Sequence, residues 1–216
     1  MRLINGQEIE YIDHVVLQHE SEVREAIDFV LAEGPIRNVI EIGTYEGGTA
    51  YIWGQLVSPM NGRVHCVDVG FGSFPVDVWN CPASNHIEAV YRNTPVEKNI
   101  VEVEGRSEDP MIIERVRRSL GDDEVDLLFH DGGHEYETVK RDFENYAPFV
   151  RTGGWIAVCD WMDETHGVSR YWPELKARYE THEFVIQRMP KEKQKSHRWL
   201  GYLNGIGLVK WEGALR

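Results

Sequence analysis

The chain has 216 residues and a mass of 25.0 kDa, which suits one domain with a sizeable core. Hydrophobic residues make up 42% and charged residues 27%, so the composition excludes a disordered chain and does not indicate a membrane protein. Asp and Glu outnumber Lys and Arg by 36 to 23, and the net charge of -13 argues against general affinity for nucleic acid or anionic lipid. We therefore expect neither a nucleic acid nor a membrane as partner.

The three cysteines, Cys66, Cys81 and Cys159, are far apart and form no CxxC pair. This spacing predicts neither a disulfide framework nor a structural zinc site, and a reducing compartment is the simpler expectation. Residues 1–10 contain no apolar stretch, and no window of the chain approaches 18 uncharged apolar residues. The sequence therefore predicts neither a signal peptide nor a transmembrane helix, and we expect a cytoplasmic location.

The first predicted elements are a helix and a buried strand. Apolar residues recur at helical spacing over 21–33, with Ser21 as the candidate N-cap, and Gly34 interrupts the pattern. Residues 38–42 are rich in β-branched side chains, which predicts a short strand.

Strands and helices alternate through the middle of the chain. The patterns predict, in order, a helix over 48–56, a strand over 64–69, a loop over 70–82, a helix over 85–93, a strand over 99–103, a helix over 110–120, a strand over 125–129, a helix with its apolar face over 136–150 and a strand over 155–159. A helix over 167–179 and two strands, 184–187 and 204–211, follow; no helical pattern separates these strands, so we expect them to be antiparallel.

The predicted fold class is α/β: a Rossmann-like, doubly wound sheet of about seven strands, mostly parallel, with a C-terminal antiparallel hairpin. The loop over 70–82 is unusually apolar for a connector. Two interpretations of it stay open, packing on the domain surface or contact with a substrate.

A glycine-rich turn, EIGTYEGG over 41–48, follows the first strand. Its glycines allow a sharp turn and close approach to a ligand, and the helix that follows offers unpaired N–H groups. Tyr45 stands where a GxGxxG fingerprint needs its second glycine, which disfavours nicotinamide and flavin nucleotides. No GKS or GKT follows, so a P-loop is also missing.

This turn resembles that of the class I S-adenosylmethionine-dependent methyltransferases. The resemblance implies that the first strand and turn pass under the methionine and ribose of the cofactor, and that the acidic residue ending the second strand, Asp68, binds the ribose hydroxyls. A carboxylate suits this role because it can accept from both hydroxyls at once. The turn residues carried over are Glu41, Gly43, Thr44, Tyr45, Gly47 and Gly48.

Ser107 follows the third predicted strand, at a position where members of this family contact the adenine of the cofactor. It could donate a hydrogen bond to the ring, or it could cap the helix that follows.

A second motif, HDGGHEY over 130–136, ends the fourth predicted strand. Ligands bind at the carboxyl edge of open α/β sheets, so polar residues there are candidates for a functional site. The motif resembles the D-G-x-H-x-Y pattern of macrocin O-methyltransferase-like and cephalosporin-hydroxylase-like proteins, and the similarity covers about 36–161.

In that branch, as in catechol-type O-methyltransferases, acidic residues after the fourth and fifth strands hold Mg²⁺. Carried over, they are Asp131, which would also meet the cofactor, and Asp160; Trp161 stands where a third acidic residue is expected. Asp163 or Glu164 could substitute from the next turn. Whether a metal is required therefore stays open.

His134 has two interpretations: a general base that takes the proton of an attacking hydroxyl, or a cap for the helix beside it. For His130 we favour a structural role at the strand end. Asp131, His134 and Asp160 would serve the acceptor, directly or through a metal.

The resemblance implies a single methyltransferase domain over 1–216, with an N-terminal segment and helix over 1–35, a cofactor-binding core over 36–161 and a C-terminal helix and late strands over 162–216. The expected reaction is methyl transfer from S-adenosylmethionine to an oxygen of a small hydroxyl-bearing molecule, and a homodimer is a reasonable expectation.

Two alternatives stay open: a catalytically idle accessory protein, which Trp161 favours, and a metal-dependent hydroxylase or hydrolase on the same fold. Beyond the motifs already described, the sequence offers no second metal-binding triad, such as two histidines and a carboxylate at short spacing, to support the latter. The basic run over 188–198 could attract an anionic substrate, but we favour a solvated loop.

Overall fold

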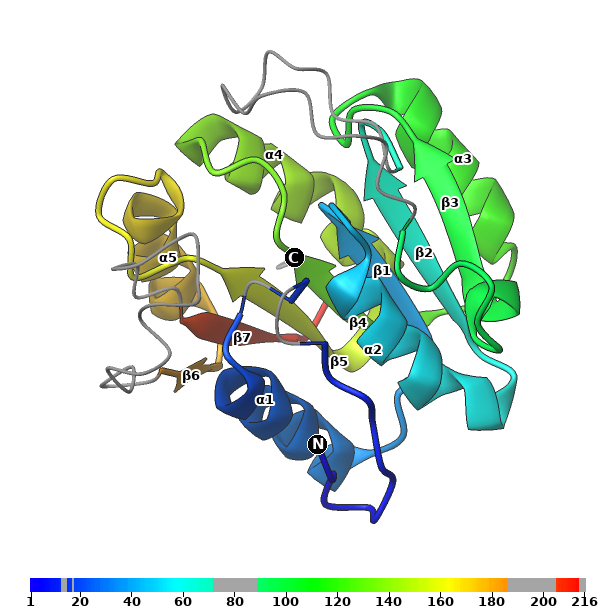
Figure 1. The fold of residues 1–216 in the computed structure, drawn as a ribbon. Helices are drawn as coiled ribbons and strands as arrows, with labels where there is room; N and C mark the ends of the chain where they lie inside the picture. The colour runs from blue at the N-terminus through cyan, green and yellow to red at the C-terminus, as the bar shows by residue number, and fades with distance from the viewer. Residues whose placement is uncertain (13–14, 17, 72–88, 186–204, 214–216) are drawn as a thin grey trace, which may run out of the picture.

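The computed structural model describes residues 1–12, 15–16, 18–71, 89–185 and 205–213. Within these ranges the chain forms a seven-stranded sheet flanked by helices (Figure 1). The strands are β1 (Asn38–Ile42), β2 (Arg63–Asp68), β3 (Ile100–Glu104), β4 (Val125–His130), β5 (Val150–Cys159), β6 (Thr181–Phe184) and β7 (Ile206–Trp211).

The strands lie in the order β3-β2-β1-β4-β5-β7-β6. Strands β1 to β5 pair in parallel, and β7 is antiparallel to both of its neighbours, β5 and β6. The prediction of a mostly parallel sheet with C-terminal antiparallel strands is therefore confirmed. The strand order reverses direction between β1 and β4, and this is the place where open α/β sheets bind their ligands.

In the described part of the chain, five α-helices cover the sheet: α1 (Glu20–Glu33), α2 (Gly48–Val57), α3 (Pro110–Leu120), α4 (Tyr136–Tyr146) and α5 (Val168–Arg178). Short 3-10 turns occupy Ser58–Met60, Glu97–Asn99 and Ala147–Phe149. Helices α1 and α2 lie on one face of the sheet, and α3, α4 and α5 lie on the other (Figure 1). Each strand alternates its side chains between the two faces, so the chain has two hydrophobic layers.

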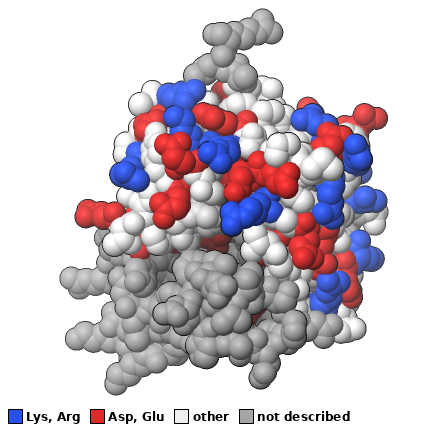
Figure 2. All heavy atoms as spheres, turned by 90° about the horizontal axis from the view of Figure 1, so that it is seen from above, with Lys and Arg blue, Asp and Glu red and all other residues white. Residues whose placement is uncertain are grey.

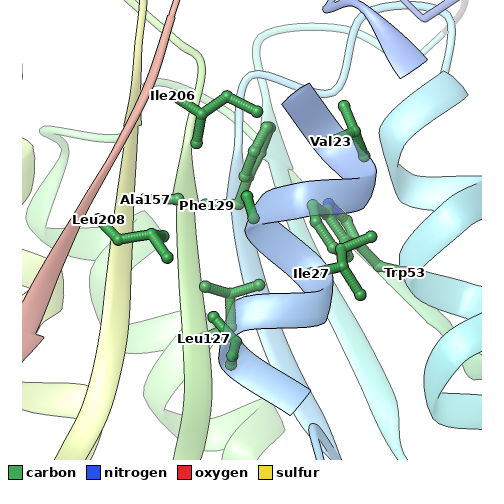
Figure 3. A pocket seen from close by; sticks show the side chains of 10 residues that line it. Val23, Ile27, Trp53, Leu127, Phe129, Ala157, Ile206 and Leu208 are labelled. Atoms are coloured by element: carbon green, nitrogen blue, oxygen red, sulfur yellow. The ribbon is translucent and has the colours of Figure 1, made fainter. Parts of the chain in front are cut away.

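The layer beneath α1 and α2 is built from aromatic and branched side chains. Val23 and Ile27 of α1 and Trp53 of α2 face Leu127 and Phe129 of β4 across a small apolar void (Figure 3). All five side chains are at most 2% exposed. Their burial supplies the hydrophobic stabilisation that holds α1 on the sheet.

The opposite layer holds α3, α4 and α5 against the sheet. Phe143 of α4 makes edge contacts with Tyr171 of α5 and with Trp211 of β7, at ring centroid distances of 6.0 and 6.1 Å. Such edge-to-face arrangements are favourable beyond the area they bury. These contacts hold α4 against α5 and β7.

Two details of the predicted helices are wrong. Helix α1 begins at Glu20, and its N-cap is His19, whose side chain accepts from the backbone N–H of Ser21 over 3.2 Å. Residues 89–93 form turns in place of the end of the helix predicted over 85–93. Asn93 there has a φ of 59°, and the proline at position 95 disfavours a helical residue before it.

The late strand predicted over 184–187 is found earlier, at Thr181–Phe184, where Thr181 pairs with Val209 and Phe184 with Ile206. The ring of His182 packs on that of Phe29 in α1 at 4.2 Å, a tertiary contact that local pattern does not reveal. Most of the predicted 70–82 loop, the start of the 85–93 helix, Cys81 and the basic run over 188–198 lie outside the described residues.

Charged side chains of both signs are interspersed over the part of the surface coloured in Figure 2. Several of them are paired, as Glu114 is with Arg118 over 2.9 Å. No helix among the described residues is long and apolar enough to cross a membrane.

Candidate active site

The carboxyl ends of β1, β2, β4 and β5 bring the predicted site residues to one edge of the sheet (Figure 1). The backbone N–H of Gly43 donates to the carbonyl of Val67 over 2.9 Å, and that of Asp131 donates to the carbonyl of Ile42 over 2.9 Å. These bonds extend the parallel ladders past the strand ends, so the turns after β1, β2 and β4 are held beside one another.

The glycine turn packs directly on the turn after β4. Gly43 has a φ of +84°, and a Cβ at this position would overlap the backbone carbonyl of Asp131. Tyr45 also has a positive φ, 51°, in the tight backbone ahead of α2. A side chain at Gly43 would separate the two turns, which explains why a residue without a Cβ stands there.

Asp68, the last residue of β2, braces this turn. Its Oδ2 accepts from the backbone N–H groups of Thr44 and Tyr45 over 2.7 and 3.0 Å, and its Oδ1 accepts from Gly70 over 3.0 Å. A carboxylate has about four lone-pair sites, so acceptor capacity remains after three bonds. The side chain therefore lies beside the glycine turn, where the sequence places it, and orders that turn as well.

Glu41 is fully buried beneath the turn. Its Oε1 accepts from Trp53 Nε1 over 3.1 Å, and its Oε2 faces Cys66 Sγ at 3.7 Å. Burial raises the pKa of Glu41 from 4.5 to about 7, although hydrogen bonds from its neighbours, including Thr49 and Thr44, oppose the rise. Glu41 thus supports the turn from within the core and does not line an open surface.

Asp131, in the turn after β4, receives a hydrogen bond from outside the predicted core. The Nε2 of Gln18, in the segment before α1, donates to Asp131 Oδ2 over 2.6 Å. Burial and the nearby charge of Asp160 raise the pKa of Asp131 well above its usual value. The two carboxyl groups are therefore close enough for the charge of one to affect the pKa of the other.

His134 and Asp160 form a pair across the site, with Nε2 of the imidazole 3.0 Å from Oδ2 of the carboxylate. Burial alone would lower the pKa of His134. The hydrogen bond and charge of Asp160 outweigh this effect, together with the charges of Asp131 and Asp163, so the pKa is raised above its usual value. Asp160 has a positive φ of 61°, uncommon for a residue with a side chain. The carboxylate lies where it can fix the orientation of the imidazole, an arrangement also found where a carboxylate holds a general base.

The third acidic position of the metal motif is filled by an aromatic side chain. Trp161 stacks against Trp172 of α5, with ring centroids 5.7 Å apart. Of the two substitutes that the sequence offers, Glu164 is exposed and Asp163 is buried. Asp163 accepts two bonds from Thr165 at Oδ1, from the backbone N–H and from the hydroxyl, while its Oδ2 is buried without a hydrogen-bond partner among the described residues.

Ser107 and His130 meet a buried carboxylate of α4. The Ser107 hydroxyl donates to Asp142 Oδ2 over 3.0 Å, and His130 Nε2 lies 3.0 Å from the same oxygen. The N-cap of α3 is Asp109, so the capping role considered for Ser107 is wrong. An adenine contact from Ser107 would require the hydroxyl to leave Asp142. His130 lies at the strand end, in the structural position expected for it.

Three residues that sequence reasoning missed contribute to this edge: Gln18, Asp142 and His166. His166 lies in the turn before α5, and its ring stacks on that of His134 with centroids 4.2 Å apart. One ligand atom each from His134, Asp160 and His166 lie within 4.8 Å of one another. Folding thus brings together two histidines and a carboxylate that the sequence does not place in one motif.

The comparisons with known proteins agree with this architecture. A methyltransferase domain family matches residues 40–161, more than half of the chain. An uncharacterised protein of Sinorhizobium fredii, y4gI, is 29% identical in an alignment of 153 residues that covers 65% of this chain. The chain spans only 15% of the length of that relative.

Two solved structures share the fold. Cofactor-bound Rv0187 from MTB has a TM-score of 0.59 and 17% identity, with 93% of this chain and 85% of that chain covered. A putative O-methyltransferase from Klebsiella pneumoniae has a TM-score of 0.57 and 15% identity, with the same coverage of 93% and 85%. The resemblance to class I S-adenosylmethionine-dependent methyltransferases is confirmed, and the chain belongs to the methyltransferase domain family.

Proposed function

We propose that the protein transfers a methyl group from S-adenosylmethionine to an oxygen of a small hydroxyl-bearing molecule. One observation carries the proposal: the glycine turn at Gly43 packs on Asp131, with Asp68 behind the turn and the His134–Asp160 pair beside it. A cofactor-binding turn and a proton acceptor thus share one sheet edge. That arrangement matches a reaction in which a donor and an acceptor must be aligned.

The cofactor side comprises the glycine turn and Asp68. Thr44, Tyr45 and the helix start at Gly47 and Gly48 would approach the methionine and ribose, and the remaining lone pairs of Asp68 would accept from the ribose hydroxyls. Glu41 acts through the turn that it supports. Ser107 remains the candidate for the adenine, by exchanging its bond to Asp142 for one to the ring.

On the acceptor side, an oxygen lone pair would form a bond to the methyl carbon as the carbon–sulfur bond breaks, leaving S-adenosylhomocysteine. His134 Nε2 lies 3.0 Å from Asp160 Oδ2, so with the Nε2 proton directed at that carboxylate, Nδ1 would take the hydroxyl proton. Asp160 stabilises the resulting imidazolium. Asp131 and Asp160 are the residues that would hold Mg²⁺, which would supply Lewis acidity at the acceptor hydroxyl.

Two matched substitutions test this division of the site. Asp68→Asn should weaken S-adenosylhomocysteine binding by about tenfold, or about 1.4 kcal/mol, because it removes charge beside the ribose. Asp160→Asn should spare that affinity and abolish transfer of a labelled methyl group to sugar and catechol probes, detected by mass spectrometry. Equal loss of cofactor affinity in both variants, or transfer to amines alone, would contradict the proposal.

A further inference from the structure

Three side chains on two separate turns meet beside the acceptor side of the site. His134 follows β4, Asp160 follows β5, and His166 precedes α5. The backbone N–H of Gly167 donates to the carbonyl of His134 over 2.8 Å, which ties the two turns together. A Cβ at Gly167 would overlap the backbone of Tyr136, so only glycine lets the turns approach this closely.

The donor atoms of this cluster lie close to the spacing that one ion requires. One ligand atom from each of His134, Asp160 and His166 lies within 4.8 Å of the other two. Nitrogen and oxygen ligands lie about 2.1 Å from a divalent transition metal, so two of them can be about 4.2 Å apart. The His134 and His166 rings are stacked at an interplanar angle of 13°, so binding one ion requires a side-chain rotation that directs both in-plane lone pairs at it.

The cluster also contains buried polar atoms that no described residue satisfies. These are Asp160 Oδ1, Asp163 Oδ2 and His166 Nδ1. The Asp163 side chain is only 7% exposed, and its Oδ2 lies 3.9 Å from His166 Nε2, too far for a hydrogen bond. Buried groups without partners are costly, and buried charges are normally paired or bind metals. The unsatisfied atoms therefore point to a ligand.

The donor types distinguish between cations. Mg²⁺ prefers oxygen ligands in an octahedron, whereas imidazole suits zinc, copper, iron and nickel ions. We propose that His134, Asp160 and His166 form a binding site for a divalent first-row transition metal, with Asp163 as a neighbouring oxygen donor. This donor set differs from the Asp131 and Asp160 pair that the family resemblance implies for Mg²⁺, and shares only Asp160 with it.

The site goes beyond the proposed function and constrains it. An imidazole nitrogen that binds a metal cannot take a proton at the same time, so a bound ion and a free base at His134 compete where they use one nitrogen. Binding can be measured without S-adenosylmethionine. A failure of the metal site would therefore leave the methyltransferase proposal untouched.

Co²⁺ is the probe, because its visible absorption reports coordination. The full chain would be freed of metal with a chelator, dialysed and titrated with Co²⁺, and then competed with Zn²⁺ or Mg²⁺. We expect a saturable spectrum at one Co²⁺ per chain, displaced by equimolar Zn²⁺ and retained in millimolar Mg²⁺. His166→Gln should weaken Co²⁺ at least about tenfold, since even second-shell partners are worth about 10–100-fold.

Two control variants separate the sites. Asp131→Asn should change Co²⁺ affinity by less than about threefold, and His182→Gln, which removes an imidazole on β6, should leave it unchanged. Circular dichroism would confirm folding, and Co²⁺ should raise the melting temperature of the wild type but not of His166→Gln. No saturable spectrum, an unchanged affinity in His166→Gln, or displacement by millimolar Mg²⁺ would overturn the proposal.

Discussion

The side-chain amide of Gln18 donates from Nε2 to Oδ2 of Asp131 over 2.6 Å. This bond joins the segment before α1 to the turn after β4, so the N-terminal segment forms part of the wall of the site. Gln18 is only 3% exposed, and its Oε1 has no hydrogen-bond partner among the described residues. A ligand hydroxyl or amine would satisfy that oxygen.

Gln18→Leu should lower the free energy of unfolding by about 1.5–3 kcal/mol, because a buried bond to a carboxylate is lost. Chemical denaturation would measure the change. The control is Gln7→Leu, which removes a bond from Nε2 to the backbone carbonyl of Gln55 far from the carboxylates. If Gln18→Leu lowered the free energy of unfolding no more than the control does, the bond to Asp131 would not contribute specifically to stability.

A methyl group at Gly43 should be far more disruptive than one at Gly6. The two glycines have nearly the same φ, +84° and +85°, but a Cβ at Gly6 meets nothing within 4 Å. Gly6→Ala should lower the free energy of unfolding by about 1–2 kcal/mol through backbone strain alone. Gly43→Ala should cost about 1–3 kcal/mol more and weaken S-adenosylhomocysteine binding. Equal stability and retained affinity would show that the close approach to Asp131 is unimportant.

The buried carboxyl group of Glu41 should make stability depend on pH. Its pKa is about 7 when folded and 4.5 ordinarily, so between these values the folded state keeps a proton that the unfolded state releases. Its contribution is complete below pH 4.5 and is lost as the pH rises through 7. The loss is about 3 kcal/mol.

The measurement is the difference in unfolding free energy between the wild type and Glu41→Gln, followed from pH 4.5 to 7.5. Both proteins contain His65, so its contribution to stability cancels in this difference. That control is needed because burial lowers the pKa of His65 to about 4, which makes stability rise with pH over an overlapping pH range. We expect the advantage of the wild type to shrink as pH rises. A difference that stays constant would contradict the protonated state of Glu41.

Ile27 anchors α1 over the void in Figure 3 and is 1% exposed. Ile27→Ala should cost about 2–5 kcal/mol, because it enlarges a space that the layer cannot fill. Ile4→Ala, at a position 65% exposed, should stay within about 0.5 kcal/mol. Similar melting temperatures for the two variants would mean that α1 contributes little to the domain.

The sequence predicts the sheet well because buried parallel strands have a strong local signature. The strand predicted over 38–42 matches β1, and the glycine turn that follows β1 lies beside Asp68. Register and ends depend on tertiary contacts, which explains the shifted β6 and the N-cap at His19.

The site was only partly predictable for the same reason. Asp131, His134 and Asp160 follow strands whose ends meet at one edge, so their convergence follows from the strand pattern. Gln18 and His166 reach the site from turns ahead of helices, and no periodic signal marks them. Their roles follow from the fold of the loops and could not be read from local spacing.

Cofactor binding tests the central claim most directly. Thermal unfolding of the full chain would be compared in buffer, in millimolar S-adenosylhomocysteine or S-adenosylmethionine, and in NAD at the same concentration. A ligand at 100 times its dissociation constant stabilises the native state by about 2.7 kcal/mol. We predict a rise in melting temperature with both sulfur ligands and none with NAD; no shift with either sulfur ligand would contradict the assignment of the glycine turn and Asp68 to S-adenosylmethionine.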